Sequence, residues 1–401
     1  MDLVYLLNTK LQPQNQEQSF RPICPRVLTR AQQILQQDRL NSQYIAEEWA
    51  AKKEAYTRQK IMMNKDKPEK DNFFARGPKN LGQVNWDEQG HRRAVMACLV
   101  QGVYAMERDR KYKRQNAMAH PWWESFGFVL HRKLIDVDDD SIMGAIYEYP
   151  PIMPSAPKHI IAFRGTHNLH DIKLDLKLIV HRFHRTSRHD IASKAVCEII
   201  DKKGTNVWLA GHSLGASVAT SVAKRLIRER GTYLETYLFN PPYPSIPIEK
   251  IQSERVKLMI RGALCLGKAI LTKELGKSCM DKENLKALSK WVPWVFVNIE
   301  DYISMEYKGY FENRKKMENL GWGRIGRVSS TISFGHIIQP ASGLDSDPTH
   351  LIPSARLSVN SSKSNCPIEL SKLSHGIRQW WADGLHLEAQ EFLYQDIHQI
   401  E

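Results

Sequence analysis

The sequence of 401 residues predicts an α/β protein built on a mainly parallel β-sheet. Apolar residues make up 42% of the chain, which is enough to build a sizeable core. From residue 159 onward, short apolar runs alternate with helical stretches, a pattern typical of parallel strands joined by crossover helices. A third observation is the glycine-flanked pentapeptide 211–215, which lies between an apolar strand and an amphipathic helix.

The expected elements follow one another in a simple order. A helix with apolar residues at helical spacing covers 91–108, and Asp87 is the residue predicted to cap it. Two β-rich runs, 126–134 and 141–149, are separated by an acidic turn and predict a hairpin or two neighbouring antiparallel strands. The other predicted strands are 159–166, 206–212, 234–240 and 291–299, and the other predicted helices are 171–180, 189–203 and 214–230.

Composition divides the chain into an extension and a core domain. Residues 1–70 are rich in Gln, Lys and Arg, so we expect a partly helical or disordered extension there, and a core domain over 71–401. Within that domain, residues 248–290 form an insertion whose apolar run carries spaced cations. This insertion predicts either a packing helix with a solvated basic face or an amphipathic lid.

The net charge of +13 suits an anionic partner such as a phospholipid surface, although it also serves solubility. The basic residues form no nucleic-acid motif, so no nucleic-acid partner is expected. The 6 cysteines lack metal-binding spacing and are typical of a reducing compartment. Without a secretory pattern or an apolar run of about 18 residues, we expect a cytoplasmic protein, soluble or peripheral to membranes, with organelle import left open.

The segment Gly211-His212-Ser213-Leu214-Gly215 joins a predicted strand to a predicted helix. Glycines two positions to either side of Ser213 permit the sharp, strained turn of a nucleophile elbow. The first-turn N–H of Leu214 has no acceptor within its helix and can stabilise an oxyanion. The alternative is an ordinary turn with a buried serine, but the strand–turn–helix setting favours the α/β-hydrolase fold with Ser213 as nucleophile.

A nucleophilic serine needs a histidine to take its proton and a carboxylate to orient that histidine. In the α/β-hydrolase fold both follow the serine, the acid first. Asp301 comes directly after the apolar strand 291–299 and is the best candidate acid, with Glu300 as a substitute. Three histidines are candidates for the base: His375, His350 and His386, of which His386 lies late in the chain and is the weakest.

GHSLGA at 211–216 and FRGT at 163–166 together resemble the signature pair of the class 3, fungal-type lipases. The chain is most similar to the plant subgroup often labelled GDSL esterase/lipase, although it contains no GDSL quartet. The resemblance runs from about residue 73 to the C-terminus through the blocks LFNPP, YISMEYKGYFENR, HLIPSARL and SHGIRQWW. It implies Thr166 as the second oxyanion donor, Asp301 as the acid and His375 as the base.

The resemblance also implies what the chain acts on. We expect a serine carboxylic-ester hydrolase that uses an acyl-serine intermediate, with an acyl lipid as its substrate and no metal or organic cofactor. The competing interpretation is a catalytically inactive hydrolase-fold protein that serves in binding or signalling, because a fold alone does not secure an activity.

Overall fold

The computed structural model describes residues 71–79, 81–150, 153–166, 187–244, 248–275, 282–323, 325–326, 350–361 and 374–394. Every described residue lies in one compact unit, Lys53–Glu401. The predicted extension at 1–70 and the predicted helix at 171–180 lie outside the described residues.

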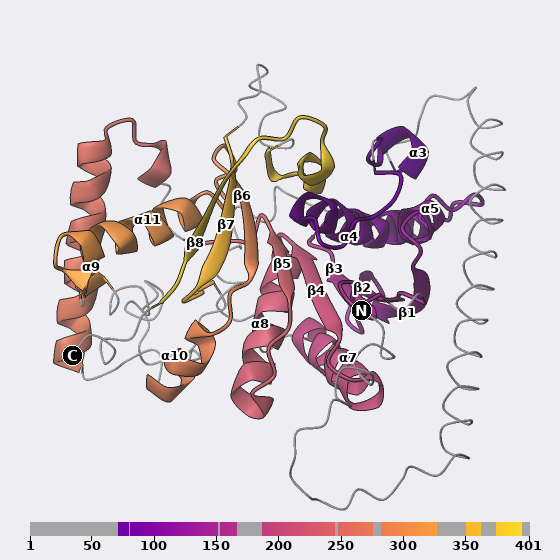
Figure 1. The fold of residues 1–401 in the computed structure, drawn as a ribbon, viewed down its shortest axis with the longest axis horizontal. Helices are drawn as coiled ribbons and strands as arrows, with labels where there is room; N and C mark the ends of the chain where they lie inside the picture. The colour runs from indigo at the N-terminus through magenta and orange to yellow at the C-terminus, as the bar shows by residue number, and fades with distance from the viewer. Residues whose placement is uncertain are drawn as a thin grey trace, which may run out of the picture. The chain divides into compact units, whose positions relative to one another are not determined.

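An eight-stranded sheet, whose strands stand side by side in sequence order, forms the centre of the described part (Figure 1). Its strands are β1 (Val129–Ile135), β2 (Ile142–Glu148), β3 (His159–Phe163), β4 (Val207–His212), β5 (Thr236–Phe239), β6 (Trp294–Asn298), β7 (Ala355–Asn360) and β8 (Leu387–Phe392). Strands β3 to β7 are parallel, whereas β1, β2 and β8 pair antiparallel. The mainly parallel sheet confirms the predicted fold class, and the antiparallel pair β1–β2 confirms the predicted hairpin. Strands β7 and β8 were not predicted.

The connections between the parallel strands carry α7 (Ser187–Lys203), α8 (Leu214–Arg230), α9 (Glu254–Leu275), α10 (Lys282–Ser289) and α11 (Glu306–Asn319). Right-handed crossovers between strands in sequence order place their helices on one face of the sheet. Accordingly, α8 packs on β3, β4 and β5 and also contacts α7 and α10. None of the described helices is long and apolar enough to cross a bilayer.

The other face of the sheet is covered by α4 (Gln89–Lys111), which precedes β1 in the chain. This helix packs on β2 to β5 and on the 3₁₀ segment η3 (Ile377–Trp381). Its N-cap residue is Glu88, so the prediction that Asp87 caps this helix is wrong by one residue. The short elements α3 (Phe73–Arg76), α5 (His120–Glu124) and η2 (Ile248–Lys250) complete the described part.

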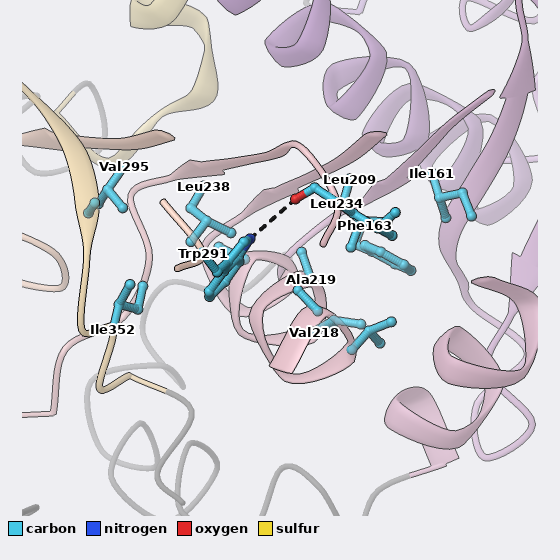
Figure 2. Close-up of a cluster of buried hydrophobic side chains, with 14 of the residues drawn as sticks. Ile161, Phe163, Leu209, Val218, Ala219, Leu234, Leu238, Trp291, Val295 and Ile352 are labelled. Carbon is cyan, nitrogen blue, oxygen red and sulfur yellow. Dashed lines mark hydrogen bonds between the residues drawn. The ribbon is translucent and has the colours of Figure 1, made fainter. Parts of the chain in front are cut away.

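Each face of the sheet has its own apolar core. Leu209 and Leu238 point to the α8 side, where Figure 2 shows them in one cluster with Trp291. Their chain neighbours Ala210 and Phe239 point to the α4 side. Successive side chains of a strand point to opposite faces, so a sheet covered on both sides needs continuous apolar runs. This is why the central strands are recognisable in the sequence.

Candidate active site

Five polar segments meet at one edge of the sheet. In a parallel sheet, the residues that follow the strands gather at the carboxyl edge. Each segment follows a different strand: Gly165 and Thr166 follow β3, Ser213 follows β4, Asn240 follows β5, Asp301 follows β6, and His375 follows β7.

Ser213 occupies a sharp turn between β4 and α8. Its φ of 54° and ψ of −127° lie in a region that L-residues rarely adopt, so the turn is strained. The Ser213 N–H donates to the Phe239 carbonyl oxygen at 2.9 Å, which pins the turn to β5. A Cβ at Gly211 would overlap the Gly215 backbone, and a Cβ at Gly215 would overlap the Phe163 backbone. Both glycines are therefore required for the close packing of strand, turn and helix.

The structure pairs His375 with Asp301. The distance from His375 Nδ1 to Asp301 Oδ2 is 2.9 Å, and both side chains are buried. The same carboxylate oxygen accepts hydrogen bonds from Ser304 Oγ at 2.6 Å and Asn240 Nδ2 at 2.7 Å. Burial alone would raise the pKa of Asp301, but the attraction of His375 and these hydrogen bonds outweigh it, so the pKa lies below its ordinary value. An ionised Asp301 only accepts, so His375 Nδ1 donates in this bond, and in a neutral ring Nε2 is then an acceptor.

Four buried polar atoms in these segments have no hydrogen-bond partner in the part of the chain that the structure describes. They are Ser213 Oγ, Ser374 Oγ, His375 Nε2 and Thr166 Oγ1. Proteins pair nearly all their buried polar atoms, so an orphaned group needs an explanation. A Cβ at Gly165 would lie 2.8 Å from Ser213 Cβ, so the residue before Thr166 touches the nucleophile candidate. These orphaned atoms together indicate a site built for a ligand or a reacting group.

Leu214 is the first residue of α8, directly after Ser213. Its N–H belongs to the first helical turn, where backbone donors lack an acceptor within the helix. The helix dipole adds a partial positive charge at the same point. The elbow therefore presents a positive end to any oxygen that approaches Ser213, as an oxyanion would require.

The other candidates for base and acid, His350 and Glu300, make different contacts. The backbone carbonyl of His350 accepts a hydrogen bond from Tyr307 Oη at 2.9 Å, and the His350 ring packs edge-on against Tyr243 with ring centroids 5.2 Å apart. The Glu300 N–H donates to Asn298 Oδ1 in the turn after β6. Among the histidines that the sequence offers as the base, His375 is hydrogen-bonded to Asp301.

Asn240 is a component of the site that sequence reasoning missed. It is fully buried and has a positive φ of 45°, a conformation that Asn tolerates better than most residues. Besides Asp301, its Nδ2 contacts the Ser374 carbonyl oxygen at 3.2 Å, and its Oδ1 accepts from Trp380 Nε1 at 2.8 Å. The position of an Asn at a strand end, before two prolines, was the available signal. Its contacts fix both the carboxylate and the segment that carries His375.

Comparison with known proteins relates the whole chain to a plant protein named as an esterase/lipase. No model of a known protein family matches the chain. The protein named GDSL esterase/lipase At4g10955, from Arabidopsis thaliana, is 38% identical over 355 residues, which cover 82% of this chain and 99% of the relative. The chain therefore belongs to the family of that plant protein. The finer resemblance to class 3 lipases stays a prediction.

Among solved structures, carboxyl esterase 2 from the mycorrhizal fungus Tuber melanosporum aligns with 49% of this chain and 75% of its own. The sequence identity is 13% and the TM-score is 0.25, which is too low to support an argument about fold or activity.

Proposed function

We propose that this protein is a serine carboxylic-ester hydrolase with Ser213 as its nucleophile. The observation that carries the proposal is the buried Ser213 Oγ, which has no partner among the described residues and stands on a strained elbow. The hydrogen-bonded pair of His375 and Asp301 lies at the same sheet edge. The family relationship to a protein named as an esterase/lipase supports the same activity.

In the proposed reaction, Ser213 Oγ attacks the ester carbonyl carbon while His375 Nε2 takes its proton. Asp301 holds the His375 ring and stabilises its positive charge. The backbone N–H of Leu214, together with Thr166 through its N–H and hydroxyl, holds the negative oxygen. His375 then protonates the leaving alcohol, and a water molecule activated by the same nitrogen releases the acid from the acyl-serine. This sequence requires no metal or organic cofactor.

The arrangement favours catalysis over a purely binding role. A strained backbone at Ser213 costs of order 1–3 kcal/mol, and each orphaned buried polar atom adds a penalty of similar size. A binding module has no use for a strained serine without a hydrogen-bond partner. A nucleophilic serine, by contrast, needs an oxygen and a neighbouring base that no other group already occupies. The ionised Asp301 beside His375 also favours catalysis, because its negative charge stabilises the positive charge that the ring gains when it takes a proton.

An acyl lipid is the substrate class that we propose. The relative's name includes lipase, and helix α9 within the 248–290 insertion exposes the apolar side chains Val256, Met259 and Leu266. With a net charge of +13, the chain is suited to a peripheral position on an anionic membrane inside the cytoplasm. We further propose that α9 acts as a lid or lipid-binding helix.

The activity is tested by hydrolysis of p-nitrophenyl butyrate and by labelling with a fluorophosphonate. Wild type should hydrolyse the ester and label at Ser213, and Ser213→Ala should lose labelling and at least about 10³-fold in kcat. Ser217→Ala is the matched control, because Ser217 is a buried serine one turn further along α8. A folded wild type that neither labels nor hydrolyses would overturn the proposal.

Substrate class needs a separate measurement. Profiling esters of increasing acyl length and lipids with different headgroups should show higher kcat/KM for long acyl chains than for acetate. A preference for thioesters or for short water-soluble esters would exclude the acyl-lipid assignment while leaving the serine mechanism intact.

A further inference from the structure

A continuous chain of hydrogen bonds links the oxyanion side of the site to the histidine side. The Gly165 N–H donates to Tyr104 Oη at 2.7 Å. Tyr104 Oη lies 2.8 Å from His212 Nδ1, and His212 Nε2 lies 2.7 Å from the His375 carbonyl oxygen. Four segments far apart in sequence contribute: α4, the end of β3, the end of β4, and the segment before η3.

The position of each proton in this series of hydrogen bonds follows from the groups at its two ends. A carbonyl oxygen only accepts, so His212 Nε2 must donate to His375. In a neutral ring, Nδ1 is then an acceptor, and the Tyr104 hydroxyl must donate to it. The Tyr104 oxygen in turn accepts from Gly165. Every bond therefore has a defined direction, from Gly165 through Tyr104 and His212 to His375.

Burial keeps this arrangement in one protonation state. It lowers the pKa of His212 to about 3 and raises the pKa of Tyr104 to about 12. Neither group gains or loses a proton near neutral pH. His212 is therefore suited to hold a position and unsuited to act as a base, even though its ring centroid lies 5.0 Å from that of His375.

We propose that Tyr104 and His212 form a positioning relay that holds Thr166 and His375 in register with Ser213. The inference rests on the proposed function. Gly165 precedes Thr166 and packs against Ser213, so the Tyr104 hydroxyl sets where the second oxyanion donor stands. His212 is bonded covalently to Ser213, and its ring donates a hydrogen bond to the His375 backbone carbonyl oxygen. It therefore holds the proposed base at a fixed position relative to the proposed nucleophile.

Tyr104→Phe is the first test. It removes one hydroxyl, and it leaves the buried Gly165 N–H and His212 Nδ1 without their partner in this relay. Small displacements of catalytic groups lower the rate of the chemical step, so kcat should fall about 10- to 100-fold. KM should stay within about twofold, because the relay makes no contact with the substrate in this mechanism.

Tyr147→Phe is the matched control. Tyr147 is also fully buried, in the same apolar cluster as Tyr104, and its hydroxyl donates to the Leu99 carbonyl oxygen at 3.1 Å. Its loss removes a comparable hydrogen bond without touching Gly165 or His212. We expect kcat close to that of wild type, whatever the change in melting temperature.

Two readouts separate positioning from a general structural effect. The first is kcat per serine titrated to completion with fluorophosphonate, which corrects for any inactive fraction. The second is inhibition by a trifluoromethyl ketone, which forms a tetrahedral oxyanion on the serine and therefore reports on the transition state. In Tyr104→Phe, its inhibition constant should rise by about the same factor as kcat falls.

A double-mutant cycle with His212→Leu tests whether the two residues act as one unit. Members of one relay should be non-additive, so the double variant should lose little more than the worse single variant. The relay alone would be overturned if the double variant lost kcat by the product of the two single losses. It would also be overturned if kcat per titrated serine were the same in Tyr104→Phe and Tyr147→Phe. A wild type that fails to hydrolyse or label would instead overturn the proposed function.

Discussion

The sheet edge that carries the candidate active site and helix α9 hold their charged and polar groups in opposite ways. At the edge, Asp301 and His375 are buried and held by short bonds from several chain segments. On α9, Arg261 lies between Glu249 at 2.7 Å and Glu306 at 2.8 Å, while Met259 on another side of the helix is 73% exposed.

The edge fixes its side chains in one geometry, whereas α9 is only attached to its neighbours. Buried, directional hydrogen bonds specify one geometry, because each group has few alternatives once water is excluded. Helix α9 is attached by ion pairs along one line, Lys257 and Arg261, and no residue of it is buried among those whose side chains are described. Gly309 on α11 makes room for the Arg261 guanidinium, since a Cβ there would overlap it. Elements with few buried apolar contacts open locally at low cost, which suits a lid.

The two histidines give the sharpest test of the edge. His375→Gln should lower kcat by at least about 10³-fold, because the base of the proposed triad is lost. His350→Gln should retain kcat within about threefold, since the His350 ring packs against Tyr243. Both variants are assayed with p-nitrophenyl butyrate. Full activity in His375→Gln would make His350 the base and remove the buried pair from the mechanism.

Asn240→Gly should lower kcat by about 10- to 100-fold, because a hydrogen bond to a charged group contributes about 1.5–3 kcal/mol. Glycine tolerates the positive φ at this position, so the change removes the side chain without adding backbone strain. Asn206→Gly is the control, because Asn206 Nδ2 donates to the Ala156 carbonyl oxygen at the opposite end of β4. Equal kcat values for the two variants would show that Asp301 keeps its orientation without Asn240.

Acidification should lower the free energy of unfolding of the protein through His212. Burial lowers the pKa of His212 from 6.5 in the unfolded chain to about 3, so between these values only the unfolded state binds the proton. Stability is therefore full above pH 6.5 and falls as the pH drops, by about 2 kcal/mol from pH 7 to pH 5. His159 is also buried with a lowered pKa and acts in the same direction. Urea unfolding at both pH values measures the loss.

The control for this pH effect is a pair of single variants. His212→Leu should remove about 2 kcal/mol of the difference between pH 7 and pH 5, whereas Tyr147→Phe, which removes a buried hydroxyl whose pKa burial raises, should leave it unchanged. An equal pH difference in both variants would mean that His212 carries no folding-linked proton.

Arg261→Met should loosen α9 and leave the edge intact. The change leaves Glu249 and Glu306 facing each other without their shared cation. We expect amide exchange in α9 to accelerate by about tenfold or more, while kcat on p-nitrophenyl butyrate stays within about twofold. Hydrogen exchange read by mass spectrometry is the measurement. Unchanged exchange in α9 would show that the ion pairs do not hold the helix.

The smallest expected effect on stability is that of Met259→Ser. An exposed side chain contributes little, so the free energy of unfolding should change by less than about 0.5 kcal/mol. Hydrolysis of an emulsified triglyceride should fall several-fold relative to the soluble ester, because the change removes apolar area from a lipid-facing helix. Val137→Ser is the control, since Val137 is equally exposed in the turn after β1. Parallel effects in both variants would remove α9 from lipid binding.

How far each region could be predicted depends on the range of its interactions. The elbow was recognisable because strand, turn, glycines and helix are consecutive in the chain, and their spacing reflects local geometry. Asp301 was recognisable because it follows an apolar strand. By contrast, β8 is an edge strand with mostly exposed side chains, so its sequence lacks the apolar run of a buried strand.

The sequence by itself determined the mainly parallel sheet, the elbow at Ser213 and the candidates for acid and base. These depend on periodicity and on short-range steric rules, which a single segment contains. Only the tertiary structure decided that His375 contacts Asp301, that Asn240 supports both, and that Tyr104 joins Gly165 to His212. These contacts join segments 61 to 134 positions apart, and hydrogen bonding over such separations leaves no local pattern in the chain.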